Sequence, residues 1–294
     1  MILNTLQERR EAIYEPAELR PGFEDTMLVL PNSQGAGLAD YHGQLAKSVA
    51  EYTGVRVLAF ERPFSADQAV MWGLRRRITA GYPSIVAHTT EHLNGIIEQE
   101  GVERAITVGH SAAGLFALYM AHTGLMPVDS VIATDPPAVR YSHVPAAEIG
   151  YGIYELHTER QKPKDDLPPN AEPQQTPTGQ ETVQRHLAEI MEYSAVYSRS
   201  RMYGAQALIG IARKQPCVGV DVFFPEHTYT GKPDYLRYLV NESKRWSEDR
   251  QTDPAAKPFN VSVIPGIYHS HFSNNHYFSE LVNTVLAERD TPRP

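Results

Sequence analysis

Residues 105–117 read AITVGHSAAGLFA and join a short apolar strand to a helix through a very tight turn. The run Ala105 to Val108 predicts a strand, and Leu115 to His122 predicts the helix that leaves the turn. A serine exposed at the top of a parallel sheet needs such a turn, which strains the backbone and brings strand and helix close together. Small residues must therefore surround Ser111, and four small residues do: Gly109, Ala112, Ala113 and Gly114.

Short apolar strands alternate with amphipathic helices over the first 135 residues. We predict strands at 26–30, 55–60, 105–108 and 128–134, and helices at 38–53, 67–78, 83–100 and 115–122. Strand and helix alternating at this spacing predict an α/β fold with a mostly parallel central sheet flanked by helices on both faces.

The alternation stops after Pro137. Residues 138–213 contain no convincing strand, and within them 160–182 is polar and rich in proline, which predicts a flexible loop. We predict two further helices at 183–198 and 202–213, strands at 218–224 and 261–264, and a last helix at 277–288. Residues 1–137 and 214–294 are therefore expected to form the core, and 138–213 a helical lid inserted over the carboxyl edge of the sheet.

The composition narrows the range of partners. The chain has 294 residues, 27 Lys and Arg against 35 Asp and Glu, and a net charge of −8. We expect no nucleic-acid partner, because the one basic cluster, residues 75–77, is too small for a phosphate-binding groove. Charges interrupt the N-terminal 14 residues, and no run of about 18 apolar residues occurs. The expectation is a soluble, cytoplasmic protein that does not associate with membranes.

Neither a metal nor a cofactor is expected. The single cysteine, Cys217, excludes an internal disulfide, and its apolar neighbours predict a small buried side chain. The twelve histidines show no i,i+4 pair with a carboxylate of the kind that forms a helical zinc site. The stretch 35–37 is too short for a nucleotide-binding loop and has no lysine.

The turn at Gly109-His110-Ser111-Ala112-Ala113-Gly114 resembles the nucleophile elbow of the α/β-hydrolase superfamily, and at the level of the fold the resemblance covers essentially the whole chain. Ala113 stands where the family usually has its final glycine. The resemblance implies that Ser111 is the nucleophile and that the N–H of Ala112 contributes to an oxyanion hole. The second donor would follow the strand at 26–30, where we favour Ser33 over Asn32. His110 is expected to pack rather than react.

In this superfamily the acid and the base follow the serine in that order along the chain. The segment 261–272 offers two histidines as base: His269, which we favour for its spacing to the final helix, and His271. The sequence Ser270-His271-Phe272-Ser273 resembles the His-Phe-Ser often seen in thioesterases.

Two carboxylates are open as the acid. Asp135 follows the strand at 128–134, as in the thioesterase domains of polyketide and peptide synthetases. Glu226 follows the strand at 218–224, where most other α/β hydrolases keep their acid. We place Asp135 slightly ahead of Glu226.

The resemblance leans toward the thioesterase-like branch through Asp135, through the long interval between Phe224 and His269, and through the lid. We favour hydrolysis of a small-molecule acyl thioester, held on a carrier protein or coenzyme A, through an acyl-Ser111 intermediate. The alternatives are a carboxylesterase or lactonase that acts on a small ester, and a non-catalytic ligand-binding protein of the same fold. The insertion carries tyrosines suited to the roof of an apolar acyl pocket: Tyr141, Tyr151, Tyr154, Tyr193, Tyr197 and Tyr203.

Overall fold

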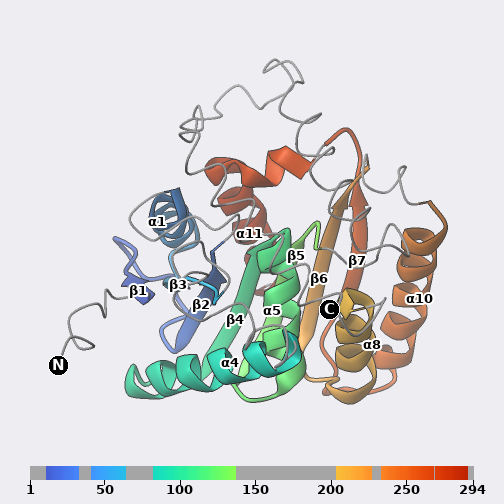
Figure 1. Cartoon of the computed structure of the whole chain (residues 1–294), viewed down its shortest axis with the longest axis horizontal. Coiled ribbons are helices and arrows are strands. Elements are labelled where there is room, and N and C mark those ends of the chain that lie inside the picture. The colour runs from blue at the N-terminus through green and yellow to red at the C-terminus, as the bar shows by residue number, and fades with distance from the viewer. Residues whose placement is uncertain are drawn as a thin grey trace, which may run out of the picture.

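The computed structural model describes residues 11–32, 41–63, 82–136, 203–226, 233–267 and 269–290. Within these ranges, seven strands form one sheet in the order β1-β3-β2-β4-β5-β6-β7 (Figure 1). The strands are β1 Glu11–Tyr14, β2 Thr26–Pro31, β3 Arg56–Phe60, β4 Arg104–His110, β5 Val128–Thr134, β6 Gly219–Pro225 and β7 Phe259–Ile264. Only β1 runs antiparallel to its neighbour β3. The predicted mostly parallel sheet is confirmed.

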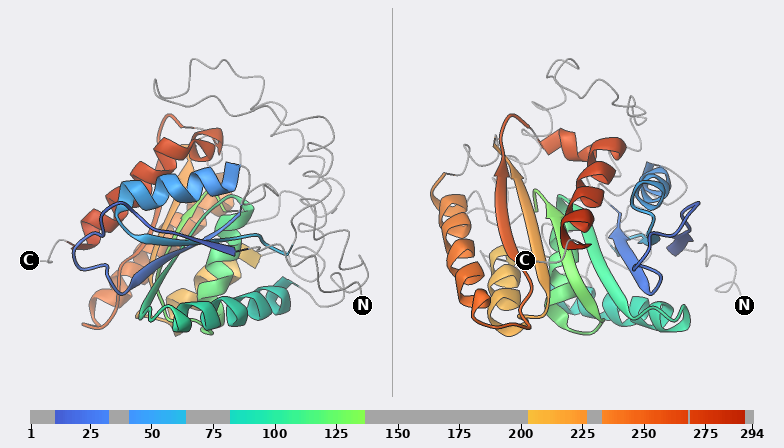
Figure 2. Two further views of the ribbon diagram at one scale, coloured as in Figure 1. Left: turned by 90° about the vertical axis from the view of Figure 1, so that its left-hand side faces the viewer. Right: turned by 180° about the vertical axis from the view of Figure 1, so that it is seen from behind.

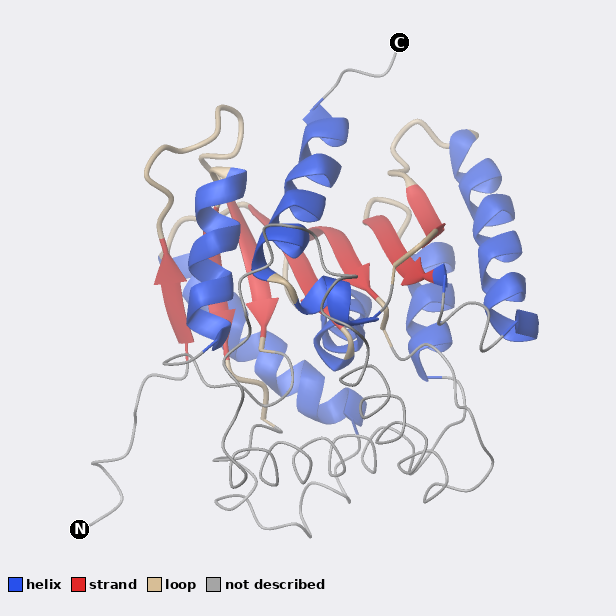
Figure 3. Cartoon of the chain, turned by 90° about the horizontal axis from the view of Figure 1, so that it is seen from above, coloured by secondary structure: helices blue, strands red, loops and turns tan. Residues whose placement is uncertain are grey.

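Helices cover both faces of the sheet, as the views in Figures 2 and 3 show. The pair α1 Tyr41–Thr53 and α11 Asn275–Asp290 packs on one face. The other face carries α4 Tyr82–Gln99, α5 Ala112–Thr123, α8 Tyr203–Lys214 and α10 Pro233–Gln251. A short 3-10 helix, η2 His269–Ser273, leads into α11.

Alternation along the central strands produces two separate cores. In β2, Met27 and Val29 join the core under α4 and α5, whereas Leu28 and Leu30 join the core under α1 and α11. The parallel strands are therefore apolar on both faces, which explains their continuous hydrophobic sequence. Helix α5 is buried from Ala112 to Ala121, because it lies between the sheet and the neighbouring helices α4 and α8.

Most of the predicted elements appear within a few residues of their expected bounds. The predicted helices at 67–78 and 183–198 and the loop at 160–182 lie outside the described residues. Strand β1 was not expected, because four residues with one charged side chain at an edge carry little of the usual strand pattern. No helix in the described ranges is both long enough and apolar enough to cross a membrane.

Helix α8 corrects the expected domain boundary. Residues 202–213 were assigned to the lid, but Ala207, Leu208 and Ile211 are fully buried in the core that α5 shares with the sheet. A methyl group on Gly210 would come within 2.2 Å of the His122 ring on α5, so the two helices pack very closely. The α8 helix therefore packs as part of the body. The rest of the expected lid lies outside the described residues.

The expectation for Cys217 was wrong. Its side chain is exposed, because Cys217 lies in the turn that leads into β6. In this turn the Val218 N–H donates to the Gln215 carbonyl at 3.0 Å. The apolar residues that follow it are buried because they belong to the strand and its entry, whereas the turn faces solvent.

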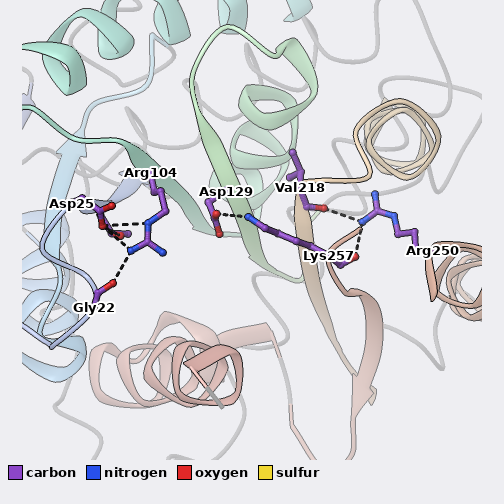
Figure 4. A network of polar contacts seen from close by, with 8 residues as sticks. Gly22, Asp25, Arg104, Asp129, Val218, Arg250 and Lys257 are labelled. Atoms are coloured by element: carbon purple, nitrogen blue, oxygen red, sulfur yellow. Dashed lines mark hydrogen bonds and ion pairs between the residues drawn. The ribbon is translucent and has the colours of Figure 1, made fainter. Parts of the chain in front are cut away.

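Charged side chains tie together the amino ends of the strands (Figure 4). Arg104 binds Asp25 through Nε at 3.2 Å and Nη2 at 2.7 Å, and Lys257 pairs with Asp129. The buried Arg250 donates to the carbonyls of Val218 and Lys257 at 2.9 and 3.1 Å, and so joins α10 to the entries of β6 and β7. These contacts lie at the edge of the sheet opposite Ser111, since all these strands begin there and β4 ends at the turn.

Candidate active site

The turn at Ser111 has the backbone that its sequence predicts. Ser111 has φ 55° and ψ −128°, between the end of β4 and the first residue of α5. A methyl group on Gly109 would lie 2.5 Å from the Ala113 carbonyl, and one on Gly114 would lie 2.9 Å from the Gly109 oxygen. Gly109 and Gly114 therefore permit the close approach of strand and helix. Ala113 is buried and fits, so its departure from the usual glycine leaves the turn intact.

Ser111 sits at the amino end of α5 without capping it. In the described part of the chain its hydroxyl makes no capping hydrogen bond, although serine commonly does so at this position. Its own N–H donates to the Thr134 carbonyl of β5 at 2.8 Å. The next residue, Ala112, opens the helix, and N–H groups in a first turn have no acceptor within the helix. Negative charge beside the partly exposed Ser111 is therefore favoured.

The structure brings His269 and Asp135 together. His269 Nδ1 lies 2.6 Å from Asp135 Oδ2, and the two side chains are 18% and 6% exposed. Because a carboxylate can only accept, Nδ1 carries the proton and Nε2 is left as the basic nitrogen of the neutral ring. Asp135 follows β5 directly, and His269 opens η2 after β7, so both residues lie at the carboxyl edge of the sheet with Ser111.

Asp135 shares the unusual backbone of Ser111. Its φ is 43°, and in the ranges that the structure describes Ser111 and Asp135 are the two residues other than glycine with positive φ. The Asp135 N–H donates to the Phe223 carbonyl of β6 at 2.7 Å, which holds this turn against the next strand. Such conformations cost roughly 1–3 kcal/mol each and cluster at functional sites. Strain here marks two of the residues that the sequence singled out.

His110 packs behind the pair, as the sequence predicts. Its ring is 4% exposed, and its centroid lies 4.4 Å from that of His269 and 5.7 Å from that of Phe272. His110 Nδ1 lies 3.2 Å from the Thr134 carbonyl and 3.1 Å from Thr134 Oγ1. Burial, and then the nearby His269, hold the pKa of His110 well below its ordinary value. His110 is therefore a neutral ring at neutral pH.

The two alternative residues lie elsewhere. Glu226 is exposed, and its Oε2 accepts the Gly266 N–H at 2.9 Å in the turn after β7. His271 is buried, its ring lies 6.3 Å from the ring of Tyr277, and its carbonyl accepts the Asn274 N–H at 3.1 Å. Glu226 thus supports the turn that leads to His269, and His271 packs η2 onto α11.

The loop after β2 is only partly described. Ser33 lies outside the described residues. The Asn32 N–H donates to the Phe60 carbonyl at 2.9 Å and continues the sheet, which makes Asn32 a poor alternative as an oxyanion donor. Asn32 Oδ1 accepts the Arg62 N–H at 2.7 Å, and its carbonyl accepts Arg62 Nε at 2.5 Å. Sequence reasoning missed this buried Arg62, since one arginine after a strand gives no distinctive signal.

Thr134 is the second residue that sequence reasoning missed. Its carbonyl lies within hydrogen-bonding distance of both Ser111 N–H and His110 Nδ1. The only available signal is its place directly before Asp135. Among the described residues, no cluster of three or more His, Cys, Asp or Glu side chains is arranged to hold a metal ion.

Comparison with known proteins identifies the fold. No family model matches the sequence, and no curated protein matches it. MenH from S. aureus superposes with a TM-score of 0.52 and 14% identity over 96% of this chain and all of that one. A carboxylesterase from Nitrososphaera gargenis gives 0.52 and 12% over 96% and 95%, and a proline iminopeptidase from Mycobacterium smegmatis gives 0.50 and 15% over 95% and 94%. The chain has the α/β-hydrolase fold.

Proposed function

We propose that this protein is a serine hydrolase that uses Ser111 as nucleophile, His269 as base and Asp135 as acid. The observation that carries the proposal is the contact of 2.6 Å between His269 and Asp135 at the edge of the sheet where Ser111 stands on its strained turn. A hydroxyl at the amino end of a helix, a histidine and a buried carboxylate are the groups that nucleophilic acyl transfer needs.

The reaction would run in two halves. Ser111 Oγ attacks the acyl carbonyl while His269 Nε2 takes the hydroxyl proton, and Asp135 stabilises the resulting imidazolium. The oxyanion would accept N–H bonds from Ala112 and, by our proposal, from Ser33. His269 then protonates the departing thiol or alcohol, which leaves acyl-Ser111. A water molecule enters, gives its proton to His269, and releases the acid by the same steps.

We favour acyl thioesters as substrates, presented on a carrier protein or on coenzyme A. The acid after β5, rather than after β6, supports this choice, because Asp135 occupies the position that the resemblance associates with thioesterases. The second candidate is a carboxylesterase or lactonase, which the similarity to a named carboxylesterase favours. A purely ligand-binding role would not explain the close contact between His269 and Asp135.

Covalent labelling tests the nucleophile. A fluorophosphonate probe should label the wild-type protein, and Ser111→Ala should abolish both labelling and turnover of acyl esters and thioesters. Ser247→Ala is the matched control, because Ser247 lies on α10 and lines the cleft at the amino edge of the sheet. Labelling that survives Ser111→Ala overturns the proposal.

Paired substrates test the specificity. We expect a higher kcat/KM for an acyl thioester than for the oxygen ester of the same acyl group. Equal or faster turnover of the oxygen ester would favour the carboxylesterase candidate.

A further inference from the structure

The residue directly before Ser111 is a histidine that has no part in the proposed reaction. His110 is the last residue of β4, is 4% exposed, and lies at the carboxyl edge of the sheet. Its ring is tilted by 44° against the ring of His269, with 4.4 Å between centroids. The His110 ring thus packs directly against the ring of the proposed base, His269.

Thr134 joins His110 to the nucleophile and to the acid. Its carbonyl accepts the Ser111 N–H at 2.8 Å and lies 3.2 Å from His110 Nδ1, and Asp135 is the next residue. Because a carbonyl only accepts, Nδ1 carries the proton of the His110 ring when it bonds there. One peptide group of β5 therefore holds the nucleophile turn, while its neighbour along the chain carries the carboxylate that binds His269.

The uncharged state of His110 suits this position. His269 becomes an imidazolium in the proposed reaction, and a positive neighbour with ring centroids 4.4 Å apart would oppose that charge. Burial keeps the pKa of His110 low, so its ring stays neutral beside the base. A flat, neutral side chain that can also donate one hydrogen bond meets both requirements.

We propose that His110 is a positioning residue: its ring holds the His269 imidazole against Asp135, and its Nδ1–H helps Thr134 hold the nucleophile turn. This inference rests on the proposed function and extends it to a residue that takes no part in the proposed proton transfers.

Two substitutions separate the two contacts. His110→Phe keeps an aromatic ring and loses the hydrogen bond to Thr134, whereas His110→Asn keeps a donor and loses the ring. His110→Ala removes both. His122→Asn is the matched control, because His122 is a half-buried histidine near the far end of α5, the helix that follows Ser111.

The readouts are kcat, KM and the far-downfield proton resonance of the hydrogen bond between His269 and Asp135. We expect His110→Ala to lower kcat roughly 10- to 100-fold with KM within about twofold, because a misplaced base slows chemistry more than binding. The resonance should broaden or vanish in His110→Asn and His110→Ala and persist in His110→Phe. His122→Asn should leave all three quantities unchanged.

An unchanged kcat and an unchanged resonance in folded His110→Asn overturn the inference. If His110→Ala fails to fold, the Phe and Asn variants, checked by circular dichroism, still decide it. A wild-type protein that the fluorophosphonate does not label would refute the proposed function instead, and the resonance would still report whether His110 positions the His269 ring.

Discussion

Asp135 and Glu226 follow neighbouring strands, and sequence alone left both as the acid. The carboxyl ends of β5 and β6 meet at one edge, so either carboxylate is close enough by topology. What distinguishes them is direction: Asp135 turns through a φ of 43° toward His269, while Glu226 supports the Gly266 turn. The positive φ of Asp135 could not be predicted from the sequence, because no neighbouring residue indicates it. The tight turn at Ser111 could be predicted, because the small residues around it are typical of such a turn.

Replacing each carboxylate by its amide tests this distinction. We expect Asp135→Asn to lower kcat by about 10³- to 10⁴-fold, since an amide favours the wrong tautomer of the base. Glu226→Gln retains an acceptor oxygen for the Gly266 N–H and should change kcat by no more than a few-fold. Steady-state kinetics on one acyl substrate measures both. A large loss in Glu226→Gln with a small one in Asp135→Asn would reverse the assignment.

At the scale of elements, the sequence predicts where helices and strands lie better than it predicts which other elements they pack against. The helix at 202–213 was located correctly but assigned to the lid, because an amphipathic pattern shows that a helix has an apolar face and not what that face meets. Strand β1 was missed because its four residues show little strand pattern of their own, and its strand conformation depends on pairing with β3. The buried strands and α5 were predictable because they are packed in apolar cores and their sequences are therefore continuously hydrophobic.

A substitution at Gly109, compared with one at a control glycine, tests the close approach of β4 and α5. Gly109→Ala places a methyl group 2.5 Å from the Ala113 backbone and should destabilise the protein by at least about 1–3 kcal/mol. Gly95→Ala is the matched control, since Gly95 lies within α4 and a methyl group there meets nothing within 4 Å. It should stabilise the helix by up to about 1 kcal/mol. Urea unfolding measures both, and a neutral Gly109→Ala would contradict the close approach.

For the whole molecule, buried histidines predict how stability responds to acid. His42 is almost fully buried, and burial lowers its pKa to about 3. The carbonyls of Leu30 and Phe60 near the ring offset part of this effect, yet neither ring nitrogen has a hydrogen bond of ordinary geometry among the described residues. Burial also lowers the pKa of His110 and of His122.

The sign follows from proton binding. An unfolded histidine titrates near pH 6.5, so between pH 7.5 and 5.5 the unfolded chain gains protons that the folded chain does not, and the free energy of unfolding falls. His42 alone should contribute roughly 1 kcal/mol of this loss. His42→Phe should therefore reduce the difference between urea unfolding at the two pH values. His88→Gln, on an exposed histidine of α4, is the control. An equal pH difference in His42→Phe and wild type would contradict the prediction.

The proposed site is divided between two parts of the chain, one on each side of residues 138–202. Ser111 and Asp135 precede residues 138–202, and His269 follows them. Parallel pairing of β5 with β6 and the bond from Asp135 N–H to the Phe223 carbonyl join the two parts. Neither part holds all three groups, so hydrolysis would require their association. A chain severed within residues 138–202 would thus act as a fragment-complementation reporter, inactive when its two pieces are apart and active when β5 and β6 pair.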